Sequence, residues 1–209
     1  VLLRIEDHDR TRSRPEYDAP LLEDLEWLGF VPDEGPVRQS AEPAAYGQAL
    51  TRLTRSHHVY ACNCSRKETV AGLQAGTSDR GGEVAYPGRC RARGLATDAP
   101  CGLRVEIAPG TERFDDGALG RQEQDPASQC GDLLLRDRDG HWTYQFAVTV
   151  DDVRQSIDLV IRGEDLLSST GRQIRLARML GRETPPVFLH HPLIVKPTGE
   201  KLSKSSGDT

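Results

Sequence analysis

The stretch Ile157-Asp158-Leu159-Val160-Ile161-Arg162-Gly163-Glu164-Asp165 joins an apolar run to a charged loop. The run from Ile157 to Ile161 predicts a β-strand. Arg162 therefore stands at the end of a strand, where α/β sheets bind their ligands. Downstream, Thr170 can cap a helix that runs through Leu176 and Leu180 and ends at Gly181. This strand–helix unit favours an α/β domain.

Strand and helix patterns also alternate in the first sixty residues. Residues Val1 to Ile5 predict a buried strand, and Glu6 follows at its end. Pro15 then begins a helix that Gly29 ends. Leucines recur in that helix at helical spacing, and a second helix carries one apolar face. The residues that carry these two patterns are Leu21, Leu25 and Leu28, and then Tyr46, Leu50 and Leu53.

The middle of the chain differs in composition. Residues 75–100 are rich in Gly, Pro and Arg and lack periodicity, which predicts a loop-rich insertion. A strand is expected from Leu103 to Ile107, and Asp139-Gly140 predicts a hairpin between Leu133–Arg136 and Trp142–Phe146. A helix should leave the cysteine pair through the capping box Ser65-x-x-Glu68, and Leu193-Ile194-Val195 should be extended after Pro185-Pro186. The whole order predicts an α/β domain with an insertion.

Composition excludes several classes of protein. The 209 residues carry a net charge of −5, so the chain as a whole does not attract nucleic acid electrostatically, although a local basic face could. No apolar run approaches the ~20 residues of a membrane span. The chain starts inside a strand-like run without Met and ends after a lysine-rich loop, so we expect it to be a fragment of a longer protein.

The cysteines indicate a metal site in a reducing compartment. There are five, and Cys62 and Cys64 are too close for an ordinary structural disulfide pattern. Together with Cys90 they offer three thiolates in a segment with little core of its own, which zinc could clamp. The alternative is three unrelated thiols, because free Cys often acts as a small buried hydrophobe.

An ordered set of motifs carries a resemblance to a known family. The set comprises Leu3-Arg4-Ile5-Glu6-Asp7, Cys62-x-Cys64, Tyr86-x3-Cys90, the run Tyr144 to Asp152, Ile161-Arg162-Gly163-Glu164-Asp165 and Lys201-Leu202-Ser203-Lys204-Ser205. Over nearly its whole length the chain resembles the catalytic domain of class I glutamyl-tRNA synthetases. The resemblance is strongest to the truncated relatives that act on queuosine in tRNA(Asp).

The resemblance implies a Rossmann-like α/β catalytic domain with a small zinc-bearing, β-rich insertion. Residues 1–60 would form the first part of the catalytic domain, residues 61–130 the insertion, and residues 131–209 the second part, which ends in the lysine loop. The family's ATP-binding His-x-Gly-His element is expected before Val1.

The resemblance also assigns roles to residues. Glu6 would hold the α-ammonium group of the amino acid, and Tyr144 and Arg162 would complete the pocket. Arg162 has the fork that matches a carboxylate in two hydrogen bonds, which would separate glutamate from glutamine. The lysine loop would supply the catalytic cations, Lys201 and Lys204, with Lys204 also binding ATP. The implied zinc ligands are Cys62, Cys64, Tyr86 and Cys90, with Cys101 as the rival for the fourth position.

The activity implied is ATP-dependent activation of glutamate, with Mg²⁺ accompanying ATP, and transfer of glutamate to the queuosine base of tRNA(Asp). We expect a cytoplasmic monomer without membrane contact. One alternative is an ordinary glutamyl-tRNA synthetase that charges tRNA(Glu). A second alternative is a non-catalytic, zinc-stabilised module that binds RNA or protein. The histidines His57, His58, His190 and His191 are expected to be mostly structural or surface residues, and the resemblance places His190 near the nucleotide.

Overall fold

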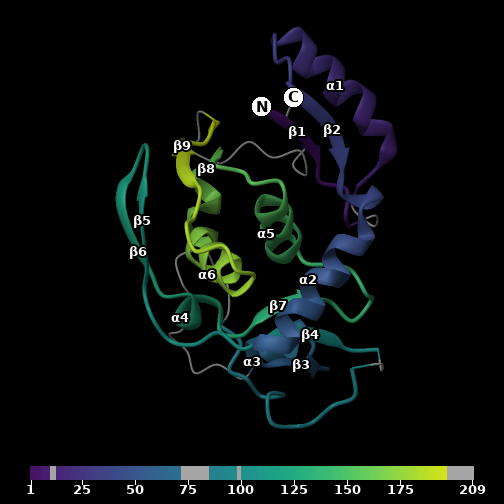
Figure 1. Ribbon diagram of the computed structural model, residues 1–209, viewed down its shortest axis with the longest axis vertical. Helices are drawn as coiled ribbons and strands as arrows, with labels where there is room; N and C mark the ends of the chain where they lie inside the picture. Colours follow the sequence, from purple (N-terminus) through teal and green to yellow (C-terminus); the bar gives the residue numbers. More distant parts are fainter. Residues whose placement is uncertain (10–12, 72–84, 98–99, 197–209) are drawn as a thin grey trace.

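The chain is described by a computed structural model that covers residues 1–9, 13–71, 85–97 and 100–196. Its secondary structure is arranged along one long axis (Figure 1). One end holds α1, β1 and β2, the helices α5 and α6 lie in the middle, and β3, β4 and α3 lie at the opposite end. Among the described residues, no helix is both long enough and apolar enough to span a membrane.

The first end is a parallel strand pair with one helix. β1 (Leu2–Ile5) pairs with β2 (Glu34–Arg38), and α1 (Asp18–Trp27) follows the short 3-10 helix η1 (Pro15–Tyr17). At the end of α1, Gly29 adopts a positive φ of 77° and its N–H bonds back to Glu26, which is a common helix-ending motif. The predicted strand and helix are confirmed, but the strand is not buried as expected, since Val1 is 75% exposed and only Ile5 is buried.

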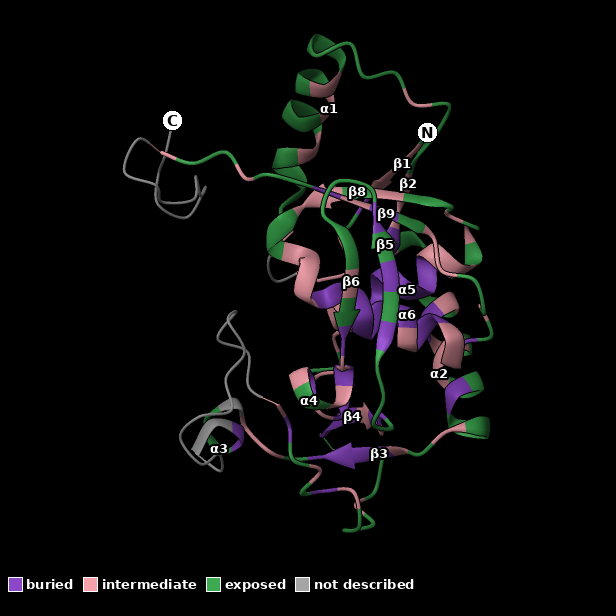
Figure 2. Cartoon of the chain, turned by 90° about the vertical axis from the view of Figure 1, so that its left-hand side faces the viewer, coloured by how far each residue is buried: buried purple, intermediate pink, exposed green. Residues whose placement is uncertain are grey.

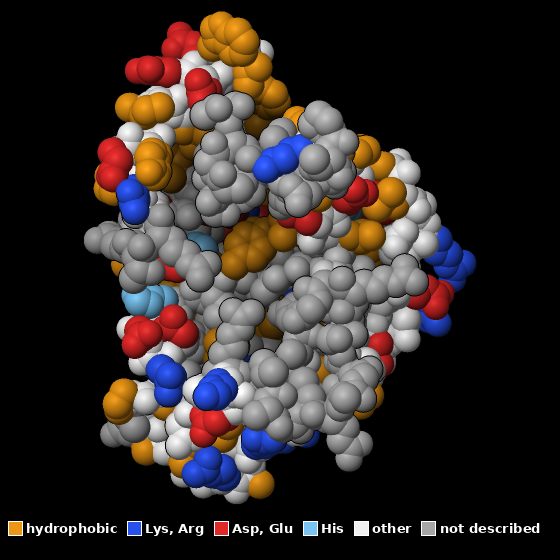
Figure 3. Space-filling view, turned by 180° about the vertical axis from the view of Figure 1, so that it is seen from behind, with side chains coloured by type: hydrophobic (Ala, Val, Ile, Leu, Met, Phe, Trp, Pro, Cys, Tyr) orange, Lys and Arg blue, Asp and Glu red, His pale blue; other side chains and the backbone are white. Residues whose placement is uncertain are grey.

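The apolar side chains of this first end are exposed. Trp27 is 85% exposed, and α1 is largely exposed (Figure 2). Hydrophobic side chains gather at the α1 end of the molecule (Figure 3). The helix predicted from leucine spacing therefore forms, but its leucines do not lie in the core. The exposed residues are Tyr17, Leu21, Trp27, Leu28, Phe30 and Val31.

The core lies where three helices meet the central strands. α2 (Pro43–Ser56), α5 (Tyr144–Arg154) and α6 (Thr170–Met179) pack together, and α5 and α6 are largely buried (Figure 2). The 3-10 helix η2 (Gln39–Ala41) leads into α2. Fully buried apolar side chains fill this contact, which makes it the main hydrophobic contribution to stability. They are Tyr46, Leu53, Val105, Leu135, Phe146, Ala147 and Leu176.

A four-stranded sheet beside α6 carries the strand that ends in Arg162. Its order is β6-β5-β9-β8, with β8 (Leu159–Gly163) parallel to β9 (Val187–His191). The hairpin of β5 (Glu112–Asp116) and β6 (Gly120–Gln124) joins β9 through β5. The 3-10 helix η3 (Glu164–Ser169) leads from β8 into α6. This hairpin belongs to residues 61–130, whose boundaries as a separate insertion stay a prediction.

The second end is a small antiparallel sheet of β3 (Val59–Cys62), β4 (Gly102–Val105) and β7 (Leu133–Arg136). α4 (Pro126–Cys130) precedes β7, and α3 (Arg66–Ala71) leaves the cysteine pair. The predicted capping box is confirmed, because Ser65 and Glu68 exchange side-chain to backbone hydrogen bonds of 2.7 and 3.1 Å.

Two predictions of local structure need correction. Asp139-Gly140 forms the predicted turn, and Trp142 makes an antiparallel bridge to Arg136, but residues 143–146 do not continue as a strand, because α5 begins at Tyr144. Burial of Phe146, Ala147 and Val150 on the core overrides the β-propensity of this segment. The strand expected at Leu193–Val195 lies earlier, at Val187–His191, and ends before Pro192, which has no N–H for the ladder.

Candidate functional site

Arg162 lies at the carboxyl half of β8, directly opposite His190 of β9 in the strand register. Its Nε donates to His190 Nε2 over 3.0 Å, its Nη1 donates to Gln173 Oε1 over 2.7 Å, and its Nη2 donates to Thr170 Oγ1 over 2.7 Å. Because a guanidinium only donates, the accepting His190 nitrogen carries no proton. All three acceptors are therefore uncharged groups, and they hold Arg162 without neutralising it.

Tyr144 lies against this guanidinium. It occupies the first turn of α5, and burial raises the pKa of its phenol, as does the nearby Glu6, while Arg162 opposes the shift. Burial also lowers the pKa of Arg162, against the effect of Tyr144, Asp152 and Glu6. Tyr144 and Arg162 share a side-chain hydrogen bond, and the charge of Glu6 acts on both, so the structure brings together three residues from separate parts of the chain.

A pair of carboxylates, Glu6 and Asp152, also lies near Arg162. Arg4 donates to Glu6 over 3.1 Å, to Asp152 over 2.9 Å and to Gln155 over 2.9 Å. Burial raises the pKa of Asp152, with Arg4 acting in the opposite direction. Two carboxylates thus share one arginine, which leaves negative charge to hold a ligand ammonium group. A guanidinium and two nearby carboxylates fit an acidic amino acid.

Arg4 and Asp152 are site neighbours that the sequence did not assign to this role. Asp152 stands in the run Tyr144 to Asp152, but no chemistry was assigned to it. Helical spacing could have identified Asp152 as a site residue. Because residues 144–154 form a helix, Asp152 lies about two turns after Tyr144 and roughly on the same face.

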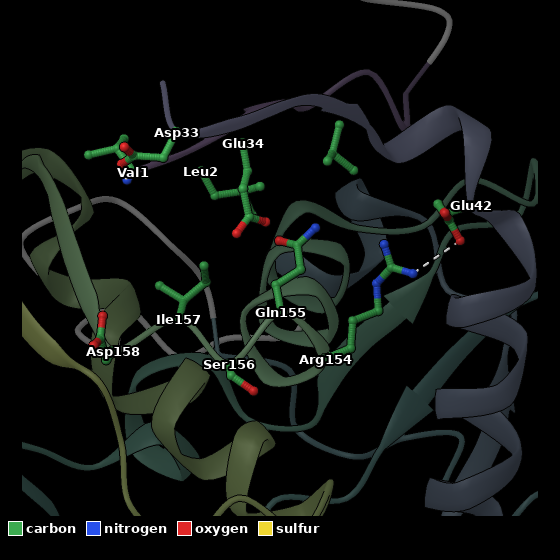
Figure 4. A pocket seen from close by; sticks show the side chains of 11 residues that line it. Val1, Leu2, Asp33, Glu34, Glu42, Arg154, Gln155, Ser156, Ile157 and Asp158 are labelled. Carbon is green, nitrogen blue, oxygen red and sulfur yellow. Dashed lines mark hydrogen bonds and ion pairs between the residues drawn. The ribbon is translucent and has the colours of Figure 1, made fainter. Parts of the chain in front are cut away.

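A cavity of about 500 Å³ lies next to this site but does not contain the predicted residues. Figure 4 shows it between the β1–β2 end and the last turn of α5, with Arg154 paired to Glu42 over 3.1 Å. Gln155 lines the cavity and also accepts the hydrogen bond from Arg4, so the cavity and the site share one wall.

The cysteine cluster forms at the opposite end of the molecule. The Sγ atoms of Cys62, Cys64 and Cys90 lie within 4.8 Å of one another. The Tyr86 hydroxyl lies 3.4 Å from Cys62 Sγ and 3.6 Å from Cys64 Sγ, and it accepts the Cys90 N–H over 2.9 Å. Cys101 packs in a different cluster, against Ala61 and Leu103. Among the described residues, the Tyr86 hydroxyl thus lies beside all three cysteines, and Asn63 Oδ1 lies 3.6 Å from Cys90 Sγ.

The separations among the three sulfurs and the Tyr86 hydroxyl can be compared with those around a tetrahedral zinc ion. Around a tetrahedral ion the sulfurs stand about 3.8 Å apart, and a phenol oxygen stands about 3.5 Å from each sulfur. The observed Cys64–Cys90 separation is 3.5 Å. Burial opposes ionisation of Cys90, but hydrogen bonds involving Tyr86, Asn63, Cys64 and Arg93 outweigh it and lower the thiol pKa to about 6. Burial raises the pKa of Tyr86, so without a cation its phenol stays protonated.

The remaining predicted residues divide into two groups. Lys201 and Lys204 lie outside the described residues. Of the histidines, His57 and His58 make contacts at the edges of the core, with Met179 and Glu106, and His191 is exposed. His190 is fully buried beside Arg162.

Comparison with known proteins identifies the class. Residues 1–209 match the family described as "tRNA synthetases class I (E and Q), catalytic domain". The structure is similar to a glutamate tRNA ligase from Elizabethkingia meningosepticum, solved in complex with its amino acid. The TM-score is 0.78 at 28% identity, over 99% of this chain and 45% of that one. The chain belongs to this class I tRNA synthetase family of ligases, and the predicted Rossmann-like α/β fold class is confirmed.

Curated relatives narrow the family further. The chain is 44% identical over 209 residues to a "Glutamyl-Q tRNA(Asp) synthetase" of Cupriavidus metallidurans, and 45% identical over 204 residues to one of Geobacter sulfurreducens. These matches cover 99% and 97% of this chain, but only 66% and 64% of the relatives. The chain therefore spans about two thirds of the curated relatives. The predicted resemblance to the queuosine-type enzymes is confirmed.

Proposed function

We propose that this chain is the glutamate-activating part of an enzyme that transfers glutamate to the queuosine base of tRNA(Asp). The observation that carries the proposal is Arg162, a half-buried guanidinium held by neutral acceptors and faced by the Glu6 and Asp152 carboxylates. That arrangement suits a ligand with a carboxylate at one end and an ammonium group at the other. The names of the relatives, glutamyl-Q tRNA(Asp) synthetases, supply the acceptor.

In this proposal the chain's residues bind and orient the amino acid. Arg162 and Tyr144 hold the side-chain carboxylate, and Glu6 holds the α-ammonium group, which leaves the α-carboxylate free to react. That carboxylate attacks the α-phosphorus of ATP, and pyrophosphate leaves. The negative charge that builds on the leaving group would be met by Lys201 and Lys204, with Mg²⁺ bound to ATP. Glutamate then passes from the adenylate to the tRNA base, and AMP leaves.

Two alternatives are less favoured. An ordinary glutamyl-tRNA synthetase would use the same activation residues, but the curated relatives at 44–45% identity carry the queuosine name. A non-catalytic module would have no use for Glu6, Tyr144 and Arg162 in one site. The expected cytoplasmic location and monomeric state stay predictions.

We predict that the full-length protein exchanges pyrophosphate into ATP with glutamate and without any tRNA. Glutamine and aspartate should give rates lower by about 10²-fold or more, because an amide or a shortened side chain leaves Arg162 without its carboxylate partner. The measurement is the rate of labelled pyrophosphate incorporation with each amino acid. Equal rates with glutamine and glutamate would remove Arg162 from substrate selection.

We also propose that Cys62, Cys64, Tyr86 and Cys90 hold one zinc ion, which would hold together the loop between β3 and β4. The expected stoichiometry is about one zinc per chain, measured by elemental analysis, and Cys62→Ser and Cys90→Ser should lose it. Matched controls are Cys101→Ser and Cys130→Ser, whose sulfurs bond to carbonyl groups of Ala96 and of Pro126 and Gly131. Loss of zinc in Cys101→Ser, with retention in Tyr86→Phe, would make Cys101 the fourth ligand.

A further inference from the structure

A line of buried polar side chains crosses the sheet behind Arg162. Asp116 ends β5, His190 lies on β9, and Arg162 lies on β8, so neighbouring strands contribute one residue each. His190 Nδ1 bonds to Asp116 Oδ2 over 2.5 Å, and Arg162 Nε bonds to His190 Nε2 over 3.0 Å. The His190 and Asp116 side chains are both 0% exposed. Neither His190 nor Asp116 has a part in binding or activating glutamate as described above.

The bonding pattern fixes which nitrogen of His190 carries the proton. Because Arg162 can only donate, His190 Nε2 must accept, and Nδ1–H must donate to Asp116. Asp116 is itself fixed, since its other oxygen accepts the backbone N–H groups of Ala118, Leu119 and His190 over 3.0, 3.0 and 3.2 Å. Burial opposes ionisation of Asp116, but the bonds from His190 and from these N–H groups lower its pKa to about 2.

The order of the groups matters for the charge on Arg162. A carboxylate bonded directly to the guanidinium would orient it but would also neutralise it and compete with a ligand anion. Here the carboxylate stands one residue back, and neutral imidazole makes the contact. Gln173 is a second neutral acceptor that is oriented by a residue behind it. Its Oε1 accepts from Arg162, while its Nε2 donates to Gln145 over 2.8 Å.

We propose that Asp116 and His190 are positioning residues that fix the direction of the Arg162 fork and thereby select the side-chain carboxylate of glutamate. The inference rests on the proposed function, because it takes glutamate as the ligand of Arg162. Asp116 sets the tautomer of His190, His190 sets the plane of Arg162, and Arg162 keeps its charge for the substrate. None of the three steps requires Asp116 or His190 to touch the amino acid.

The sharpest test is Asp116→Asn in the full-length enzyme. The three backbone N–H groups hold the side-chain oxygen of the new amide in place, so the NH₂ group of that amide must face His190 Nδ1. The proton of His190 then moves to Nε2 and opposes the Arg162 N–H, with almost no change of shape. We expect KM for glutamate to rise by about 10- to 100-fold, kcat at saturation to change by less than about 3-fold, and the preference for glutamate over glutamine to fall.

Two readouts separate positioning from a structural role. The ¹⁵N shifts of the His190 ring should report an Nδ1–H tautomer in the wild type and an Nε2–H tautomer in Asp116→Asn. His190→Gln can accept from Arg162 and donate to Asp116, and should keep KM within about 5-fold of the wild type, whereas His190→Leu should raise it like Asp116→Asn. If thermal unfolding shows that Asp116→Asn does not fold, the comparison of His190→Gln with His190→Leu still tests the positioning role.

The outcomes are distinct from those of the proposed function. A wild-type enzyme that does not activate glutamate contradicts the proposed function itself. An active wild type with unchanged KM and selectivity in folded Asp116→Asn overturns the inference alone. Equal losses in folded His190→Gln and His190→Leu also overturn it, because the hydrogen-bonding pattern would then have no role.

Discussion

Arg162→Gln is expected to lower kcat/KM for glutamate in pyrophosphate exchange by about 10³-fold or more. The substitution removes the cation and its fork, so the substrate carboxylate would be buried without a charged partner. It also removes the Arg162 donor to the buried His190 Nε2, which leaves the Thr170 hydroxyl, 3.3 Å away, as the partner of that nitrogen. The measurement is exchange as a function of glutamate concentration, with folding checked by thermal unfolding.

Two further variants sharpen this experiment. Arg162→Lys keeps the charge but not the two-pronged geometry, so its kcat/KM should fall between those of the wild type and Arg162→Gln. Arg113→Gln is the matched control, because Arg113 is exposed on β5 of the same sheet and pairs with the exposed Glu123 over 2.8 Å. Near-normal activity in folded Arg162→Gln would remove Arg162 from the substrate site.

Lys204→Ala in the full-length protein is expected to lower glutamate-dependent pyrophosphate exchange by about 10²-fold or more, with folding intact. The reason is loss of a cation that acts mainly on the charge of the departing pyrophosphate. The effect should therefore appear in kcat rather than in KM for glutamate, which is the reverse of the pattern expected for Asp116→Asn.

The control for this lysine is Lys67→Ala. Lys67 is exposed on α3, which lies at the end of the molecule away from β8, the strand that carries Arg162 (Figure 1), so its loss should leave exchange unchanged. Wild-type exchange by Lys204→Ala would show that the lysine loop does not stabilise the leaving group. The prediction rests on the motif and its chemistry, because Lys204 lies outside the described residues.

The local signals in the sequence were sufficient for part of the fold. The strand that carries Arg162 was predicted from its apolar run, although it lies at Leu159–Gly163 and not at Ile157 to Ile161. The end of α6 was predicted from Gly181, whose φ of 91° suits glycine. The start of α5 was not predictable in this way. Tyr144 to Val150 has the β-branched and aromatic composition of a strand, and only burial against α2 and α6 makes it helical.

The site, like the fold, was predictable from the sequence only in part. The motifs named Glu6, Tyr144 and Arg162, and the cysteine spacing named three sulfurs that the structure brings together. The partners of Arg162 could not be named, because they depend on strand register. His190 faces Arg162 only because β9 lies beside β8, and Asp116 reaches His190 only because the hairpin of β5 and β6 joins the same sheet. Pairings over 28 and 74 residues leave no local pattern in the sequence.

The central claim is that the enzyme activates glutamate and places it on queuosine in tRNA(Asp). The most direct measurement is transfer of radiolabelled glutamate by the full-length protein to tRNA(Asp) with queuosine, tRNA(Asp) without it, and tRNA(Glu). We predict that the tRNA(Asp) with queuosine is labelled and that the other two tRNAs are not. The modified base would be accessible to the enzyme because it lies unpaired in its loop. Stable labelling of tRNA(Glu) at its 3′ end would contradict the account and assign the chain to the enzymes that charge tRNA(Glu).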